Sequence, residues 1–206
     1  MANFLIWYKW TFRPKFNGWF FKLLYSGKKV KVGKNFRCDT FPELLITQSG
    51  KLIMGDNVIF RRNVEIRSHQ NSKIIINSNI RIDRSVRLLA TNNSIIEIKD
   101  GTRIGANTVV NGGDSVTIGE KTLISGFVVL QTSMHKFENK NNIQEQGYKH
   151  APITLGKDVW LGANVVILPG CTLNKGCIVG SNAVVKNDVN SYEIVGGIPA
   201  VKIKER

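Results

Sequence analysis

Residues 153–173 read Ile-Thr-Leu-Gly-Lys-Asp-Val-Trp-Leu-Gly-Ala-Asn-Val-Val-Ile-Leu-Pro-Gly-Cys-Thr-Leu, and they decide the fold. Here and on to residue 189, an aliphatic or small residue recurs at two positions in every six. One row is Ile153, Val159, Val165, Cys171, Cys177, Ala183 and Val189, and the other is Leu155, Leu161, Ile167, Leu173, Val179 and Val185. Two apolar positions separated by one polar residue give the inward face of a short strand. The unbroken six-residue period predicts a parallel β-helix in which three strands close each coil.

The same period runs back through the chain, with extra residues entering only after the third strand of a coil. Its earlier pairs are Leu52/Met54, Val58/Phe60, Val64/Ile66, Ile74/Ile76, Ile80/Ile82, Val86/Leu88, Ile96/Ile98, Thr102/Ile104, Thr108/Val110, Val116/Ile118, Thr122/Ile124 and Val128/Leu130. The pairs Val30/Val32 and Phe36/Cys38 predict a less regular first coil, and the largest insertion is a loop at residues 131–152. We therefore expect an all-β solenoid of about seven coils over residues 30–190, roughly 34 Å long, followed by a C-terminal segment at 191–206.

Composition agrees with one soluble globular domain, since the 206 residues are 42% hydrophobic. Cys171 and Cys177 fall on different sides of a coil, where they are expected to be small core residues rather than a disulfide. The first 29 residues lack the apolar core of a secretory signal and any run long enough to cross a membrane. These features favour a reducing, cytoplasmic location.

Residues 1–29 do not follow the six-residue period and form a distinct aromatic and basic segment. They hold 10 of the 18 aromatic residues, and residues 1–37 contain nine Lys or Arg and no acidic residue. We expect a helical segment split by Pro14. It either caps the open end of the solenoid or contacts the anionic inner leaflet of a membrane. Nucleic acid is a weaker alternative, because no nucleic-acid-binding module is present.

The chain contains three histidines, and their positions in the repeat suggest different roles for them. His69 lies in a corner insertion and is expected to be an exposed loop residue. His135 opens the long loop beside the wall of the rod, where an imidazole of near-neutral pKa is suited to take a proton from a hydroxyl. His150, near the other end of that loop, is expected to be structural.

The chain resembles the hexapeptide-repeat acyltransferases in three stretches. They are residues 153–173, residues 179–189 and the terminal Val-Gly-Gly-Ile-Pro-Ala-Val-Lys-Ile at 195–203. The similarity is greatest to the maltose, galactoside and polysaccharide O-acetyltransferase branch, and it covers residues 100–206 well. The resemblance implies a left-handed coil, although parallel crossovers are generally right-handed. It also implies a homotrimer with sites between neighbouring rods and acetyl-CoA as the acyl donor, without a metal.

The resemblance also assigns roles to individual residues. His135 matches the catalytic base, with Lys136 where proline is usual, and the N–H of Ala163 matches an oxyanion donor. Trp160 and Ser181 match positions along the pantetheine arm, and Asn107 matches a residue that contacts the acceptor. Coenzyme phosphate is expected near Lys186, Lys202 and Lys204, where the family more often has a shifted lysine and C-terminal arginines.

The favoured function is O-acetylation of a sugar hydroxyl on a surface polysaccharide or its precursor, such as O-antigen, capsule or exopolysaccharide. The sequence leaves open N-acetylation of a nucleotide-linked amino sugar and a non-catalytic scaffold on the same solenoid. A trimeric zinc enzyme is disfavoured, because no third histidine is spaced to join His135 and His150 as a ligand. The acceptor sugar, the position of its hydroxyl and the length of the acyl group are not encoded in any motif.

Overall fold

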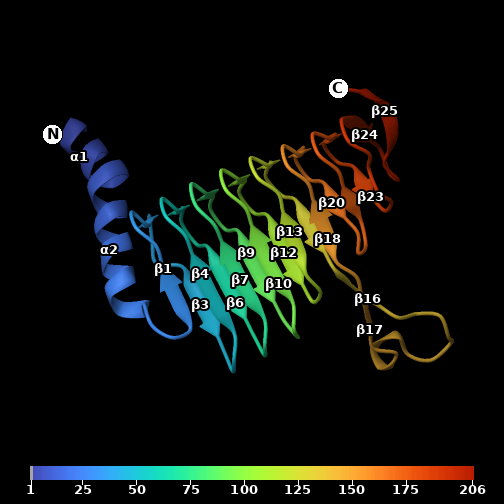
Figure 1. The fold of residues 1–206 in the computed structure, drawn as a ribbon, viewed down its shortest axis with the longest axis horizontal. Helices are drawn as coiled ribbons and strands as arrows, with labels where there is room; N and C mark the ends of the chain where they lie inside the picture. The colour runs from blue at the N-terminus through green and yellow to red at the C-terminus, as the bar shows by residue number, and fades with distance from the viewer. Residues whose placement is uncertain (1) are drawn as a thin grey trace.

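The structure is a computed structural model that describes residues 2–206, with side chains from residue 3 onward. Its main body is a rod of stacked coils with three sheets as its sides, parallel except for the last strand of one of them (Figure 1). The first sheet contains β1 (Val30–Val32), β4 (Lys51–Met54), β7 (Lys73–Ile76), β10 (Ile95–Ile98), β13 (Val116–Ile118), β18 (Ile153–Leu155) and β21 (Thr172–Leu173). The second contains β2 (Arg37–Cys38), β5 (Ile59–Phe60), β8 (Arg81–Ile82), β11 (Arg103–Ile104), β14 (Leu123–Ile124), β19 (Trp160–Leu161), β22 (Ile178–Val179), β24 (Glu193–Gly196) and β25 (Val201–Glu205). The third contains β3 (Glu43–Ile46), β6 (Glu65–Ser68), β9 (Arg87–Ala90), β12 (Val109–Gly112), β15 (Val129–Gln131), β20 (Val166–Ile167) and β23 (Val184–Val185).

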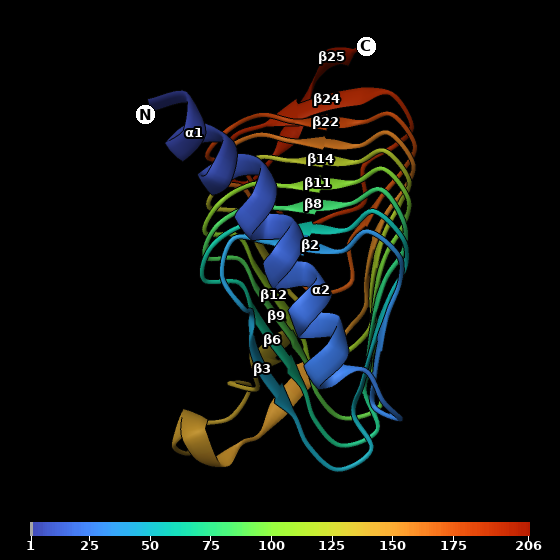
Figure 2. The same ribbon diagram turned by 90° about the vertical axis from the view of Figure 1, so that its left-hand side faces the viewer.

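The predicted solenoid of about seven coils is confirmed, and viewed along its axis it winds left-handed (Figure 2). Every residue of the predicted apolar pairs is buried in one continuous core. Three threonines occupy core positions, and their hydroxyls are satisfied by the neighbouring coil. Thr102 Oγ1 donates to the carbonyl of Gly119 at 3.0 Å, and Thr122 Oγ1 donates to that of Gly156 at 3.1 Å. A buried hydroxyl is tolerated here because it has a partner.

The corners between the sheets carry several of the predicted site residues. We call them the first corner (first to second sheet), the second corner (second to third sheet) and the third corner (third sheet to the next coil). The third corner spans residues 47–50, 69–72 and 91–94 in successive coils and shortens to 113–115 in the next. There, His69 is partly buried and its Nδ1 lies 2.9 Å from Thr47 Oγ1, so the expectation of an exposed loop histidine is wrong.

A hairpin leaves the rod at the third corner after β15. It consists of the antiparallel strands β16 (Ser133–His135) and β17 (Tyr148–His150), joined by a segment with the 3-10 helix η2 (Ile143–Glu145). Figure 1 shows this hairpin along the same lower edge as the corner loops of the earlier coils. The corner loops and the hairpin therefore form one side of the molecule.

The N-terminal segment is a continuous helical rod of α1 (Ala2–Trp7), the π-helical η1 (Tyr8–Phe12) and α2 (Arg13–Tyr25). The prediction that Pro14 splits the helix is wrong. The wider turns of η1 end directly before it, and the N–H of Arg13 donates to the carbonyl of Tyr8. Pro14 then lies in the first turn of α2, where its missing N–H is tolerated.

Helix α2 lies across the first coil at the end of the rod (Figure 2). Phe21 is fully buried, and its ring packs against Phe36 with centroids 5.3 Å apart. A Cβ at Gly18 would collide with the carbonyl of Phe36, so this close approach requires glycine. Asn17 Nδ2 donates to the carbonyls of Cys38 at 3.2 Å and Asp39 at 3.0 Å, which satisfies acceptors along the edge of the sheet.

Candidate active site

The β16–β17 hairpin fixes His135 at the edge of the rod. His135 pairs with Tyr148, and Ser133 pairs with His150. The rings of His135 and Tyr148 have centroids 4.3 Å apart, and Ser133 Oγ lies 2.8 Å from His150 Nδ1. Both imidazoles are exposed to solvent. The hairpin thus presents an accessible imidazole whose ring is held by an aromatic neighbour.

A polar network anchors the root of this hairpin to the rod. Thr132 Oγ1 donates to the carbonyl of Asn111 at 2.7 Å, and Asn111 Nδ2 donates to Gln131 Oε1 at 2.8 Å. Gln131 Nε2 in turn donates to the carbonyl of Ser133 at 2.7 Å. Each amide bridges two segments, so the network limits how far the hairpin swings from the wall.

The predicted oxyanion donor lies at the second corner. The N–H of Ala163 donates to Ser181 Oγ at 3.2 Å, and both residues are exposed. Asn107 lies at the same corner, three coils before Ser181, in a left-handed conformation with φ of 58°. This corner thus gathers Ala163, Ser181 and Asn107 but not His135.

Trp160 lies on the second sheet beside a shallow hollow. Its side chain is 49% exposed, and its Nε1 lies 3.5 Å from Ser125 Oγ. The hollow has a volume of about 310 Å³ and is lined by Leu123, Asp158, Val159, Trp160, Ile178 and Arg206. The sequence analysis missed Arg206, whose guanidinium lies 2.8 Å from Asp158 and brings a positive charge to this hollow.

The predicted phosphate-binding lysines do not form one cluster. Lys202 Nζ lies 3.0 Å from Glu205 and 3.3 Å from Glu193, and hydrogen bonds to these two carboxylates raise the pKa of Lys202. Lys204 is an exposed residue of β25, whereas Lys186 follows β23 at the third corner. Of the three, Lys202 is already paired with acidic groups.

A single chain does not bring the predicted groups together. His135 lies at the third corner and Ala163 at the second, so the two stand at opposite edges of the third sheet. Within residues 2–206, no cluster of three or more His, Cys, Asp or Glu side chains is arranged to hold a metal ion. None of the helices in this part of the chain is long and apolar enough to cross a membrane.

The repeat matches a known family. Residues 152–187 match the family described as "Bacterial transferase hexapeptide (six repeats)". Galactoside O-acetyltransferase of Escherichia coli is 33% identical over 44% of this chain and 44% of its own length. A second E. coli protein is 32% identical over 45% of this chain and 51% of its own length. It is provisionally named as a lipopolysaccharide biosynthesis O-acetyl transferase. The chain spans about a third to a half of the length of the curated relatives it matches first.

Solved structures share the solenoid. A hexapeptide-repeat acetyltransferase of Vibrio cholerae, in complex with acetyl coenzyme A, is 35% identical over 53% of this chain and 60% of its own, with a TM-score of 0.51. An N-acyltransferase of Bacillus cereus, in complex with dTDP and coenzyme A, covers 85% of this chain and 83% of its own with a TM-score of 0.58. At 21% identity, the second likeness concerns the fold alone. The resemblance to hexapeptide-repeat acetyltransferases is therefore confirmed.

Proposed function

We propose that the protein is an acetyl-CoA-dependent O-acetyltransferase that acts on a sugar hydroxyl of a surface polysaccharide or its precursor. The observation that carries the proposal is the exposed imidazole of His135, which a paired hairpin holds at the edge of a rod whose repeat is that of named acetyltransferases. An accessible, oriented imidazole is the group that such a transfer needs as its base.

The proposed chemistry gives each group a defined role. His135 accepts the proton of the acceptor hydroxyl while that oxygen forms a bond to the thioester carbonyl carbon. The N–H of Ala163 donates to the resulting oxyanion, a role that displaces Ser181 Oγ, its present acceptor. When the oxyanion collapses, the carbon–sulfur bond breaks, and the imidazolium of His135 returns its proton to the departing thiolate. The products are the acetyl ester and free coenzyme A.

This chemistry requires a second copy of the chain. His135 and Ala163 stand at opposite edges of one sheet, so a site between neighbouring rods joins the hairpin of one copy to the second corner of another. We propose a homotrimer, which places three equivalent sites at three such junctions. Mixing His135→Ala with Ala163→Pro chains tests the sharing. Mixed trimers with an intact junction should regain turnover that neither variant shows alone.

The hollow beside Trp160 fits the coenzyme. The half-exposed indole offers an apolar face for the pantetheine arm, while Arg206 and Lys204 supply positive charge for phosphate. Lys202 is paired with two carboxylates, Glu193 and Glu205, whereas Arg206 is paired with one, Asp158, and we therefore assign the phosphate contact to Arg206 before Lys202. Ser181 remains a proposed contact of the arm, Lys186 a proposed contact of the coenzyme phosphate, and Asn107 a proposed contact of the acceptor.

The choice of a polysaccharide acceptor is supported by the E. coli relative with a provisional role in lipopolysaccharide biosynthesis. The N-terminal helix adds support, because most of its aromatic side chains remain exposed next to lysines. We propose that this surface binds the inner leaflet of the membrane, where lipid-linked glycan precursors lie, and that the enzyme is cytoplasmic.

N-acetylation of a nucleotide-linked amino sugar is the second candidate, since the B. cereus neighbour of the same fold is an N-acyltransferase. Release of coenzyme A should be measured with matched hydroxyl and amino acceptors, for wild type and His135→Ala. The proposal expects an ester product and a loss of about 10²–10⁴-fold in the variant. An amide product would favour the second candidate. Failure of the wild type to bind coenzyme A would leave a non-catalytic scaffold.

A further inference from the structure

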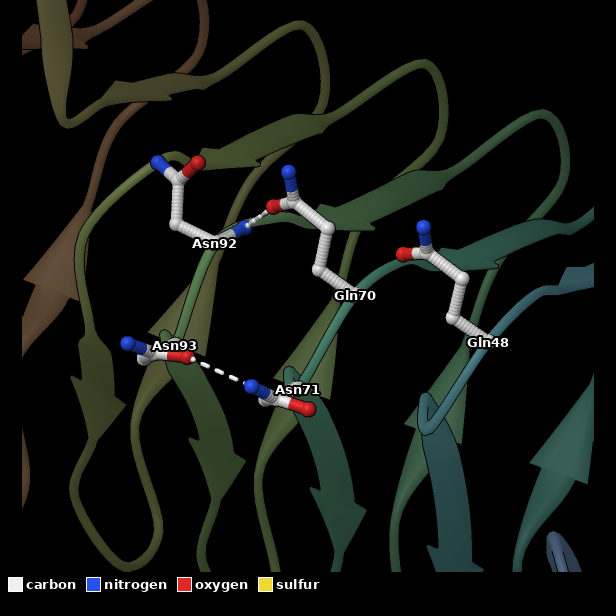
Figure 3. Close-up of a pocket in the computed structure, with 5 residues that line it drawn as sticks. All are labelled: Gln48, Gln70, Asn71, Asn92 and Asn93. Atoms are coloured by element: carbon white, nitrogen blue, oxygen red, sulfur yellow. Dashed lines mark hydrogen bonds between the residues drawn. The ribbon is translucent and has the colours of Figure 1, made fainter.

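A groove lined by side-chain amides runs along the third corner of the first coils. Its lining residues are Gln48, Gln70, Asn71, Asn92 and Asn93, and its volume is about 600 Å³. Figure 3 shows Gln48, Gln70 and Asn92 in one row, one from each successive coil, with Asn71 and Asn93 in a second row below. Coils repeat every 4.8 Å or so, and the groove therefore extends about 10 Å along the rod.

Contacts connect this groove to the candidate active site. Gln70 Oε1 accepts the backbone N–H of Asn92, and Asn92 Nδ2 donates to the carbonyl of Gly113 at 2.8 Å. A Cβ at Gly113 would collide with Ser133 Oγ and lie 2.9 Å from His150 Nδ1. The corner also shortens at 113–115, directly before the hairpin leaves the rod. The row of amides thus ends at the base of the strands that carry His135.

A second amide row on the same molecule shows what a purely structural ladder looks like. At the first corner, Asn35 Nδ2 donates to Asn57 Oδ1 at 3.1 Å, and Asn57 Nδ2 donates to Asn79 Oδ1 at 3.0 Å. Asn35 and Asn57 each donate to the side chain of the next coil, as a stabilising ladder requires.

The groove differs because most of its amide groups do not hydrogen-bond to the side chain of the next coil. Between its side chains, only Asn71 Nδ2 donates to another, Asn93 Oδ1, at 3.2 Å. Within the described residues 2–206, the Gln48 amide, Gln70 Nε2 and Asn92 Oδ1 have no hydrogen-bond partner. These groups offer donors and acceptors to solvent or to a ligand.

We propose that this groove binds a glycan chain and places its reducing or non-reducing end beside His135. This inference rests on the proposed function. A carboxamide both donates and accepts, which matches a sugar hydroxyl that does the same. The lining carries no formal charge, so the groove selects a neutral stretch of sugar residues. A groove of about 10 Å extends beyond the single sugar residue that reacts. The acceptor is accordingly an oligomer or polymer rather than a free monosaccharide.

The test compares two double substitutions to glycine, both at residues with a left-handed backbone conformation. Gln48→Gly/Gln70→Gly removes the groove's amides at left-handed positions (φ 50° and 55°), where glycine is unstrained. Asn57→Gly/Asn79→Gly does the same at the first corner (φ 58° and 61°) and serves as the control. The acceptors are a graded series of oligosaccharides from partial hydrolysis of the host's surface polysaccharide, including its monosaccharides.

For wild type, KM should fall as the oligosaccharide lengthens. The groove variant should lose this gain, with KM for the long acceptors raised about tenfold by the missing hydrogen bonds. Its kcat and its KM for the monosaccharide should not change, and the control pair should behave as wild type. Equal KM for short and long acceptors in wild type would overturn the groove proposal. An equal rise in KM for the long acceptors in the groove variant and in the control variant would also overturn it. A change of oligomeric state confined to the groove variant would also overturn it, because the amides would then join copies of the chain.

Titration calorimetry of the full chain with the same oligosaccharides, in the absence of acetyl-CoA, separates the two proposals. Binding that weakens only in the groove variant, without turnover by wild type, retains the groove and removes the proposed reaction. Turnover with no length-dependent binding retains the reaction and removes the groove.

Discussion

The imidazole of His135 and the phenol ring of Tyr148 lie against each other, with centroids 4.3 Å apart and planes inclined by 37°. This contact joins two strands across a loop, and it leaves the imidazole exposed. The ring of Tyr148 thus acts on His135 as a positioning group.

We expect Tyr148→Ala to lower kcat about tenfold, because the imidazole then samples orientations away from the acceptor. Tyr148→Phe keeps the aromatic contact and should retain near-normal turnover. Steady-state kinetics on both variants checks this. Equal losses in the two variants would instead assign the effect to the hydroxyl of Tyr148.

Ala163→Pro is expected to lower kcat by about 10²–10³-fold, the effect of removing one oxyanion donor. The substitution removes the N–H, which otherwise donates to Ser181 Oγ, and also fixes φ of residue 163. Asn164, the next residue, holds the left-handed turn position with φ of 58°, and proline is common before such a residue. Ala163→Gly retains the N–H and is the control. A turnover in Ala163→Pro equal to that of the control would show that this N–H has no part in the reaction.

Phe21→Ala is expected to destabilise the protein by about 3–5 kcal/mol, since a fully buried aromatic ring leaves a cavity between α2 and the first coil. Trp19 lies two residues earlier and is 60% exposed. Trp19→Ala should therefore change the free energy of unfolding by less than about 0.5 kcal/mol. Urea unfolding of both variants measures the difference, and similar values would show that the helix does not pack as described.

Trp7→Ala/Trp19→Ala is expected to weaken binding to vesicles that contain anionic lipid, while secondary structure and assembly are retained. Both indoles are exposed, and Lys9 and Lys15 lie near them in the sequence. Phe137→Ala removes an equally exposed aromatic ring from the hairpin and should leave vesicle binding unchanged. Substitution is a better test than deletion of residues 1–29, because Phe21 is part of the core. Unchanged sedimentation with vesicles would contradict the membrane proposal.

Stability should fall as pH rises above about 9. Burial raises the pKa of the Cys38 and Cys177 thiols from 9.0 to about 12, so between these values the folded chain binds protons that the unfolded chain has lost. The free energy of unfolding then decreases by about 1.4 kcal/mol per pH unit for each thiol. Denaturant unfolding between pH 8 and 11 measures the slope, and Cys177→Ala should reduce it. In native protein at pH 8, both thiols should resist alkylation.

The core could be predicted from the sequence because each coil repeats the same burial pattern. Ile153 or Leu173 is buried for the same reason as Leu52, and an error at one position would have broken the phase of all the others. The three core cysteines, Cys38, Cys171 and Cys177, followed from that phase as well. Even the threonines at core positions fit, since the neighbouring coil supplies a carbonyl for each hydroxyl.

The remaining features depend on contacts that no period encodes. The register of the hairpin, which sets Ser133 opposite His150 and His135 opposite Tyr148, spans a loop without repeat. The one signal in the sequence for this pairing is the alternation of side chains in Ser-Met-His and Tyr-Lys-His, at the two ends of the loop. Arg206 was missed because β25 turns back on β24 and carries the residue to the Trp160 hollow. Pro14 was misjudged because a π-helical stretch precedes it.

Helix α2 also covers part of the open end of the strand stack. A stack of parallel strands presents, at its first coil, a row of backbone groups that would template another chain in the manner of a growing fibril. Asn17 and Lys22 direct their donors to carbonyls of that row, including that of Gly33 at 3.1 Å, and so occupy it. These carbonyls already have donors, so they are not available to pair with a strand of a second rod.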